Sequence, residues 1–155
     1  MKKLSETFIK AKYGKGGDES NLITIQLPYP MKLAWDTKTK ITSIRCHKLI
    51  ATDLTNVFKD ILATYGLPKI QELGIDLYGG CYNFRLMRGG SSLSRHSWGI
   101  AIDLHPEANG LKTPFSKALF SKPEYKELHE AFEKHGFINL GKVYNYDTMH
   151  WEIAK

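Results

Sequence analysis

The chain has 155 residues, of which 42% are hydrophobic and 25% are charged. These proportions exclude a disordered or fibrous protein, and the length fits one domain that can bury its own core. Lys and Arg number 22 against 16 Asp and Glu, so the formal charge is +6. The charge favours contact with polyanions, but a basic surface that only faces solvent is equally compatible with it.

The first 20 residues begin basic and become glycine-rich and polar over residues 13–20. They lack the apolar core of a secretory signal peptide, so we expect a cytoplasmic protein whose residues 1–20 form a flexible arm or loop. No stretch approaches the roughly 18 apolar residues of a membrane span, and no stable membrane association is expected. Cys46 and Cys81 form no CxxC motif and are expected to be core thiols in a reducing compartment. We expect a single domain over residues 1–155 and a monomer.

The first half of the chain predicts short strands followed by one helix. Apolar and polar residues alternate in the strand candidates, and Pro28 and Pro30 interrupt them. Helical spacing of apolar residues follows, and Gly66 and Pro68 supply a stop. The predicted strands are Leu22 to Leu27, Lys32 to Trp35 and Ile41 to Arg45, and the predicted helix is His47 to Tyr65.

The second half predicts one more helix among several strands. Ser121 is a candidate cap for this helix, Pro123 would lie just inside it, and Gly136 would end it. Because strands and helices do not alternate regularly, we predict an α+β domain with a small, mostly antiparallel sheet and two main helices packed against it. The further predicted strands are Ile75 to Tyr78, Tyr82 to Leu86, Trp98 to Leu104, Phe137 to Leu140 and Met149 to Ala154.

Asp103 is the most informative residue, because it lies at the end of an apolar strand. Burying an ionised carboxylate without a partner costs several kcal/mol, so a compensating group is expected. Strand alternation places Gly99 and Ala101 on the face of Asp103, where their small size leaves room for an ion and a substrate. His96 precedes Asp103 by seven residues, and an intervening turn could bring its imidazole back towards the carboxylate.

A second cluster near the C-terminus contains Asp147 and His150. Two histidines and one carboxylate are a common ligand set of catalytic zinc, whose fourth position is left to water. The sequence therefore predicts zinc bound by His96, Asp103 and His150, with Asp147 able to take a proton from that water. The remaining histidines are expected to have structural or surface roles: His47, His105, His129 and His135.

These residues resemble the zinc D-Ala-D-Ala metallopeptidases, a family that includes carboxypeptidases, dipeptidases and phage L-alanyl-D-glutamate endolysins. The family pattern Ser-x-His-x-x-Gly-x-Ala-x-Asp matches residues 94–103, and its acid-x-x-His element matches Asp147 and His150. The resemblance implies the same three zinc ligands, Asp147 as general base and Arg85 as the residue that holds or polarises substrate. Ser94 is expected to bind substrate or to cap a turn.

The resemblance also implies a substrate, the peptide stems of bacterial peptidoglycan. Many dipeptidase-type members have Glu at the position of Asp147, whereas some phage endolysins have Asp. We therefore expect an endolysin-like L-alanyl-D-glutamate endopeptidase that reaches the cell wall after release from the cytoplasm, with D-alanyl-D-alanine carboxypeptidase as the alternative. Glu152 shares the strand face of His150 and is expected to orient its ring or to serve as a substitute base.

Three rival classes can be compared with this interpretation on the residues alone. Iron(II) oxygenases also use two histidines and one carboxylate, but they typically place the first His and the acid two residues apart. A zinc-stabilised cell-wall binding module would need no base at position 147. A nucleic-acid binder is not expected, since no helix-turn-helix, zinc finger or basic-aromatic run is present.

Overall fold

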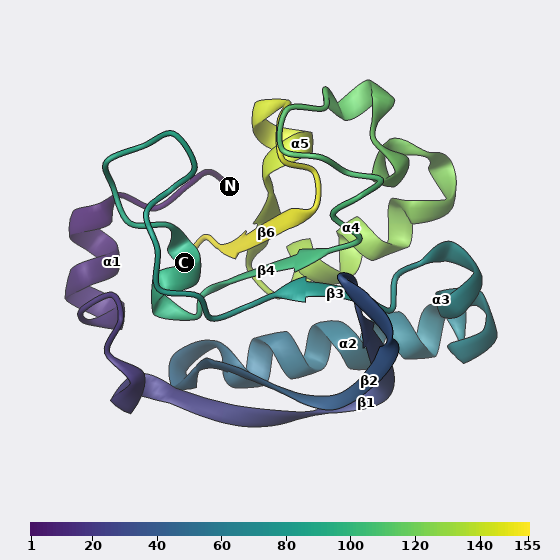
Figure 1. Ribbon diagram of the computed structural model, residues 1–155, viewed down its shortest axis with the longest axis horizontal. Helices are drawn as coiled ribbons and strands as arrows, with labels where there is room; N and C mark the ends of the chain where they lie inside the picture. Colours follow the sequence, from purple (N-terminus) through teal and green to yellow (C-terminus); the bar gives the residue numbers. More distant parts are fainter.

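The computed structural model describes residues 1–155 and contains one six-stranded sheet of order β2-β1-β3-β4-β6-β5 (Figure 1). Only β1 and β3 run parallel, and all other neighbouring strands are antiparallel. The predicted α+β class with a mostly antiparallel sheet is confirmed. The strands are β1 (Leu22–Leu33), β2 (Asp36–His47), β3 (Leu77–Gly80), β4 (Ala101–Leu104), β5 (Phe137–Asn139) and β6 (His150–Ile153).

The first two strands form a longer hairpin than predicted. β1 continues through Pro28 and Pro30, because the pairing with β2 shifts register between Gln26 and Met31. In that irregular stretch the two prolines need not donate ladder hydrogen bonds. Trp35, predicted to end a strand, instead lies in the turn of the hairpin and is 67% exposed.

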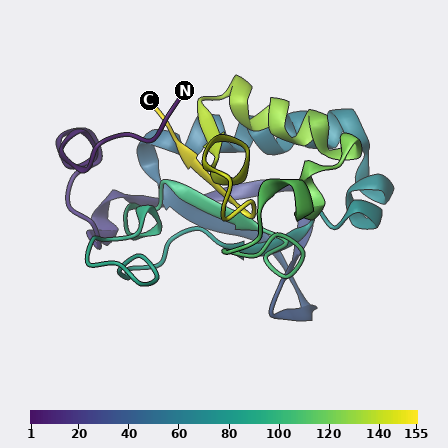
Figure 2. The same ribbon diagram turned by 90° about the horizontal axis from the view of Figure 1, so that it is seen from above.

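Two helices cover one face of the sheet, as predicted (Figure 2). α2 (Ala51–Tyr65) packs against β1 and against α4 (Lys126–Lys134). The side chain of Phe132 on α4 stacks on Trp151 of β6 with ring centroids 4.4 Å apart, so burial of large aromatic rings joins helix to sheet. None of the helices combines the length and the apolar character that crossing a membrane requires.

The helix α2 ends at Tyr65 before Gly66, as predicted, whereas other helix boundaries differ from the predictions. Pro68 lies in the first turn of an additional helix, α3 (Leu67–Leu73), because proline is tolerated where no backbone donor is needed. Ser121 does not cap α4: its hydroxyl donates to the carbonyl of Ala118 at 2.8 Å. A 3-10 turn over Pro123–Tyr125 precedes α4, which has no side-chain cap. A further short helix, α5 (Leu140–Tyr144), leads towards the C-terminal strand.

Part of the N-terminal segment that we expected to be a flexible arm or loop forms a helix instead. α1 (Glu6–Tyr13) begins at Ser5, whose hydroxyl accepts a hydrogen bond from the Phe8 amide. Ile9 and Tyr13 are buried in the main core, and the Tyr13 hydroxyl donates to the carbonyl of Lys155 at 2.5 Å. The two ends of the chain therefore lie side by side (Figure 2).

Candidate metal centre

His96, Asp103 and His150 converge at the middle of the sheet, where their ligand atoms all lie within 4.8 Å of one another. Asp103 on β4 and His150 on β6 are directly paired across antiparallel strands. His96 lies in a 3-10 turn that ends at Gly99, whose φ of 69° reverses the chain direction into β4. The turn thus brings His96 back to Asp103, as predicted from their separation.

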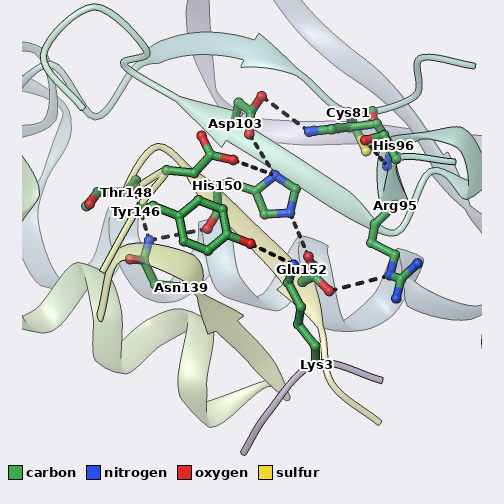
Figure 3. Close-up of polar contacts among 12 residues, drawn as sticks. Lys3, Cys81, Arg95, His96, Asp103, Asn139, Tyr146, Thr148, His150 and Glu152 are labelled. Atoms are coloured by element: carbon green, nitrogen blue, oxygen red, sulfur yellow. Dashed lines mark hydrogen bonds and ion pairs between the residues drawn. The ribbon is translucent and has the colours of Figure 1, made fainter. Parts of the chain in front are cut away.

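Both imidazoles are held by their second nitrogen (Figure 3). Nδ1 of His96 lies 2.7 Å from the carbonyl oxygen of Cys81, to which it donates. Nε2 of His150 donates to Oε1 of Glu152 at 2.9 Å. These contacts leave Nε2 of His96 and Nδ1 of His150 as lone-pair acceptors, and each lies 3.2 Å from an oxygen of Asp103. This arrangement of anchored imidazoles is typical of metal-ligating histidines.

The metal-facing atoms lie at ion-pair distance from one another, but two of them form no hydrogen bond. Nε2 of His96 and Oδ1 of Asp103 are buried and make no hydrogen bond. Such atoms are costly unless a cation or water satisfies them. The residues therefore fit a divalent metal ion bound by two nitrogens and one carboxylate.

The electrostatics of the centre also favour a cation. Burial alone would lower the pKa of His150, but the carboxylates of Asp103 and Glu152 raise it to about 10. Burial alone would raise the pKa of Asp103, yet His96 and His150 hold it well below its ordinary range. Without a metal, a proton would occupy the position between His150 and Asp103. Metal binding would have to displace that proton.

Asp147 lies at the edge of the same centre. Its Oδ2 is 3.7 Å from Nδ1 of His150, and its backbone adopts a φ of 55°. The amide of Asp147 donates to the carbonyl of Leu111 at 2.9 Å, which helps to fix this unusual conformation. Burial raises the pKa of Asp147 above its ordinary value, so its carboxylate is a better proton acceptor than a solvated one.

A cleft of about 640 Å³ opens at the metal centre and contains Arg85, Ser94 and Asp147 in its lining. Residues 82–86 do not form the predicted strand. Arg85 lies instead in a loop closed by a bridge between Leu86 and Leu93. Nη1 of Arg85 donates to the carbonyl of Leu86 at 3.2 Å, and the side chain forms no ion pair. Ser94 caps the 3-10 turn by accepting from the His96 amide at 3.3 Å.

The glycine that lies against Asp103 is not the predicted Gly99 but Gly79. Gly99 lies outside β4, and a Cβ there would meet the amide of His47 at 3.0 Å. Its small size therefore allows close backbone packing. Gly79 of β3 lies against Asp103, since an added Cβ would be 3.0 Å from the Asp103 Cβ. The alternation within the predicted 98–104 strand could not identify Gly79, which comes from another strand.

The other four histidines lie outside the metal-ligand group. Three of them use Nε2 in a contact elsewhere: His47 with the Tyr13 carbonyl, His129 with the Phe120 carbonyl and His135 with Asp60. His105 packs edge-on against Phe120. Trp98 and Trp151 are buried in the core, as are Cys46 and Cys81.

Comparison with known protein families finds a match over part of the chain. Residues 88–153 match the family described as D-alanyl-D-alanine carboxypeptidase. The match confirms the resemblance to the zinc D-Ala-D-Ala metallopeptidases, and it covers Ser94 together with the three candidate ligands and Asp147. Arg85 and everything before it lie outside the matched segment. Searches of curated proteins and of solved structures found no significant match.

Proposed function

We propose that this chain, which carries a metallopeptidase segment at residues 88–153, is a zinc-dependent hydrolase of peptidoglycan stem peptides. The observation that supports this most directly is the convergence of Nε2 of His96, Nδ1 of His150 and the Asp103 carboxylate. Each imidazole has its other nitrogen occupied by a hydrogen bond, so the free nitrogens are preset for a metal.

Three protein ligands of nitrogen and oxygen type are the usual set for catalytic zinc. Zinc in such a site supplies Lewis acidity, which polarises a carbonyl oxygen and lowers the pKa of water to about 7. The fourth position would face the cleft, where a substrate has access. A structural zinc site would be closed by a fourth protein ligand, and no further residue joins this group.

We assign the proton transfers of the reaction to Asp147. In our proposal its carboxylate takes a proton from the attacking water and passes a proton to the amine of the leaving peptide. The short distance to His150, 3.7 Å between Oδ2 and Nδ1, keeps Asp147 next to the metal position. A module that only bound zinc would not need a second carboxylate of raised pKa at this place.

Arg85 is the proposed grip on substrate. Its guanidinium lines the cleft without an ion-pair partner, and a planar bidentate donor is well suited to a carboxylate or a developing oxyanion. Arg88 and Arg95 also line the cleft. Arg95 is committed elsewhere, since its Nη2 donates to the Leu4 carbonyl at 3.0 Å and its Nε lies 3.8 Å from Glu152.

Two cleavage sites are in competition. The Asp at position 147 resembles some phage endolysins and favours the L-alanyl-D-glutamate bond inside the stem. The description of the matching family favours removal of the terminal D-Ala. We propose the endopeptidase as the principal activity, acting on the cell wall after release from the cytoplasm, and the carboxypeptidase as the second candidate.

Digestion of purified peptidoglycan with the zinc-loaded protein, followed by mass spectrometry of the products, tests the proposal. New carboxyl ends at L-Ala support the endopeptidase, whereas released D-Ala supports the carboxypeptidase. The Asp147→Asn protein is the matched control for contaminating hydrolases. Absence of any new terminus with a protein that binds zinc stoichiometrically would leave a zinc-stabilised binding module.

A further inference from the structure

Lys3 reaches the cleft from the N-terminal segment, far in sequence from the metal ligands. Its ammonium donates to the hydroxyl of Tyr146 at 2.7 Å, and its backbone amide donates to the hydroxyl of Tyr144 at 3.0 Å. The ammonium also lies 5.7 Å and 5.5 Å from the centroids of these two rings. Contacts with Tyr144 and Tyr146 therefore fix the position of the Lys3 ammonium.

Lys3 lines the same cleft as the candidate metal centre. Lys3, Asp103, Asp147 and His150 line the same cleft. In the view of Figure 3, Lys3 and Asp103 lie on opposite sides of His150, with Lys3 close to Glu152. A peptide bound in this cleft could therefore contact both the metal position and the Lys3 ammonium.

The ammonium of Lys3 forms no ion pair within the protein. No carboxylate oxygen lies within 4.0 Å of it, although it is partly buried. The nearest carboxylate in Figure 3, Glu152, already binds His150 and faces Arg95. A lysine ammonium has three donors, and only one is used by Tyr146. Lys3 thus presents unused donors to the cleft, and its charge, which helps to lower the pKa of Glu152, is not taken up by a direct ion pair.

The charges of the cleft favour an anionic ligand. Its acidic residues are Asp103, Asp147 and Glu152, and its basic residues are Lys3, Arg85, Arg88 and Arg95. With a divalent cation at the metal centre, positive charge exceeds negative charge. Such a site attracts anions and concentrates them near the metal.

We propose that Lys3 forms a carboxylate-binding subsite that selects peptides with an acidic residue beside the cleaved bond. This inference rests on the proposed peptidase function and names the substrate feature that the site would read. The ammonium would bind a free carboxyl group of the peptide, as a compact point charge that needs no fixed orientation. The N-terminal segment is then part of the substrate site.

The test compares two synthetic peptides that contain L-alanyl-D-glutamate and differ only in one group: the free carboxyl of glutamate in one is a carboxamide in the other. Cleavage gives kcat and KM for the zinc-loaded protein, and calorimetry gives Kd on an Asp147→Asn background, which prevents turnover. The variants are Lys3→Met, which keeps the aliphatic stem, and Lys3→Arg, which keeps the charge. Lys2→Met is the matched control, because Lys2 is exposed and does not line the cleft.

Lys3→Met should raise KM and Kd for the carboxylate peptide by about 10-fold, the effect of losing one partly solvated charge-assisted hydrogen bond. The carboxamide peptide should be unaffected, kcat should be unchanged, and Lys3→Arg should restore binding. Equal weakening of both peptides would show that Lys3 only holds the N-terminal segment, and unchanged binding of both would also overturn the subsite. Failure of the wild type to cleave either peptide would count against the proposed function, while the calorimetric comparison would still decide the role of Lys3.

Discussion

Nε2 of His150 and Oε1 of Glu152 lie 2.9 Å apart on the same face of β6, two residues from each other in the sequence. The contact fixes the His150 ring so that Nδ1 faces Asp103. Glu152 is itself held near Arg95, which reaches the carbonyl of Leu4 in the N-terminal segment. A candidate metal ligand is therefore positioned through contacts that begin at the far end of the chain.

Loss of either histidine ligand should remove the metal. His96→Ala and His150→Ala each leave two ligands, too few for a catalytic zinc site, so zinc binding and peptidase activity should both fall to background. Zinc content after dialysis, measured by plasma emission spectrometry, checks this. His135→Ala is the control, since His135 pairs with Asp60 outside the cleft and should keep full zinc. Stoichiometric zinc in either ligand variant would contradict the assigned centre.

Asp147→Asn should separate metal binding from turnover. The amide cannot accept the proton of water, so kcat should fall by about 10²–10⁴-fold, the usual contribution of a general base. Zinc should remain bound, because Asp147 is not one of the three ligands. Steady-state kinetics and metal analysis of the same preparation measure both effects. Asp60→Asn is the control carboxylate, and activity of Asp147→Asn within twofold of the wild type would exclude Asp147 as the base.

Glu152→Gln should weaken the metal centre without abolishing it. The glutamine oxygen can still accept from Nε2 of His150, but it lacks the charge that makes His150 a stronger ligand. Zinc affinity should therefore fall by about 10-fold, the lower end of effects measured for such supporting residues. Competition with a chelator measures the affinity. Glu133→Gln, which removes only a surface pair with Lys142, should leave it unchanged; equal losses in both variants would argue against a specific role for Glu152.

Buried neutral histidines should make the protein less stable in acid. Burial lowers the pKa of His47, His105 and His129 below the ordinary 6.5. The unfolded chain then binds more protons than the folded chain below about pH 6.5, so the free energy of unfolding should decrease as the pH falls through this window. Urea denaturation at a series of pH values measures the slope.

His129 is the clearest contributor to that slope. Its Nε2 donates to the Phe120 carbonyl at 2.8 Å, and its Nδ1 is buried without a partner, so a second proton would have nowhere to bond. His129→Gln keeps a donor for Phe120 and cannot be protonated. It should reduce stability at pH 7 by about 1–2 kcal/mol, as typical core changes do, and flatten the pH dependence. An unchanged slope would mean that other groups cause the acid sensitivity.

The sequence by itself predicted the fold class, the two main helices and the three residues that converge as candidate ligands. These predictions rest on local regularities: helical spacing in α2, the apolar strand that ends at Asp103 and the short motif spacings near His96 and His150. Such patterns can be recognised within a few neighbouring residues, because helix and strand periodicity repeats over short stretches. A carboxylate within an apolar stretch is recognisable in the same way, because burying it is costly.

Only the tertiary structure decided which residues surround that site. Gly79 lies against Asp103 through pairing of β3 with β4, and Lys3 enters the cleft because the N-terminal segment docks near the C-terminal strand. The extension of β1 through two prolines likewise depends on a register shift against its partner. These contacts join residues far apart in the chain, and no local pattern specifies them, because their energy comes from packing and charge in the folded molecule.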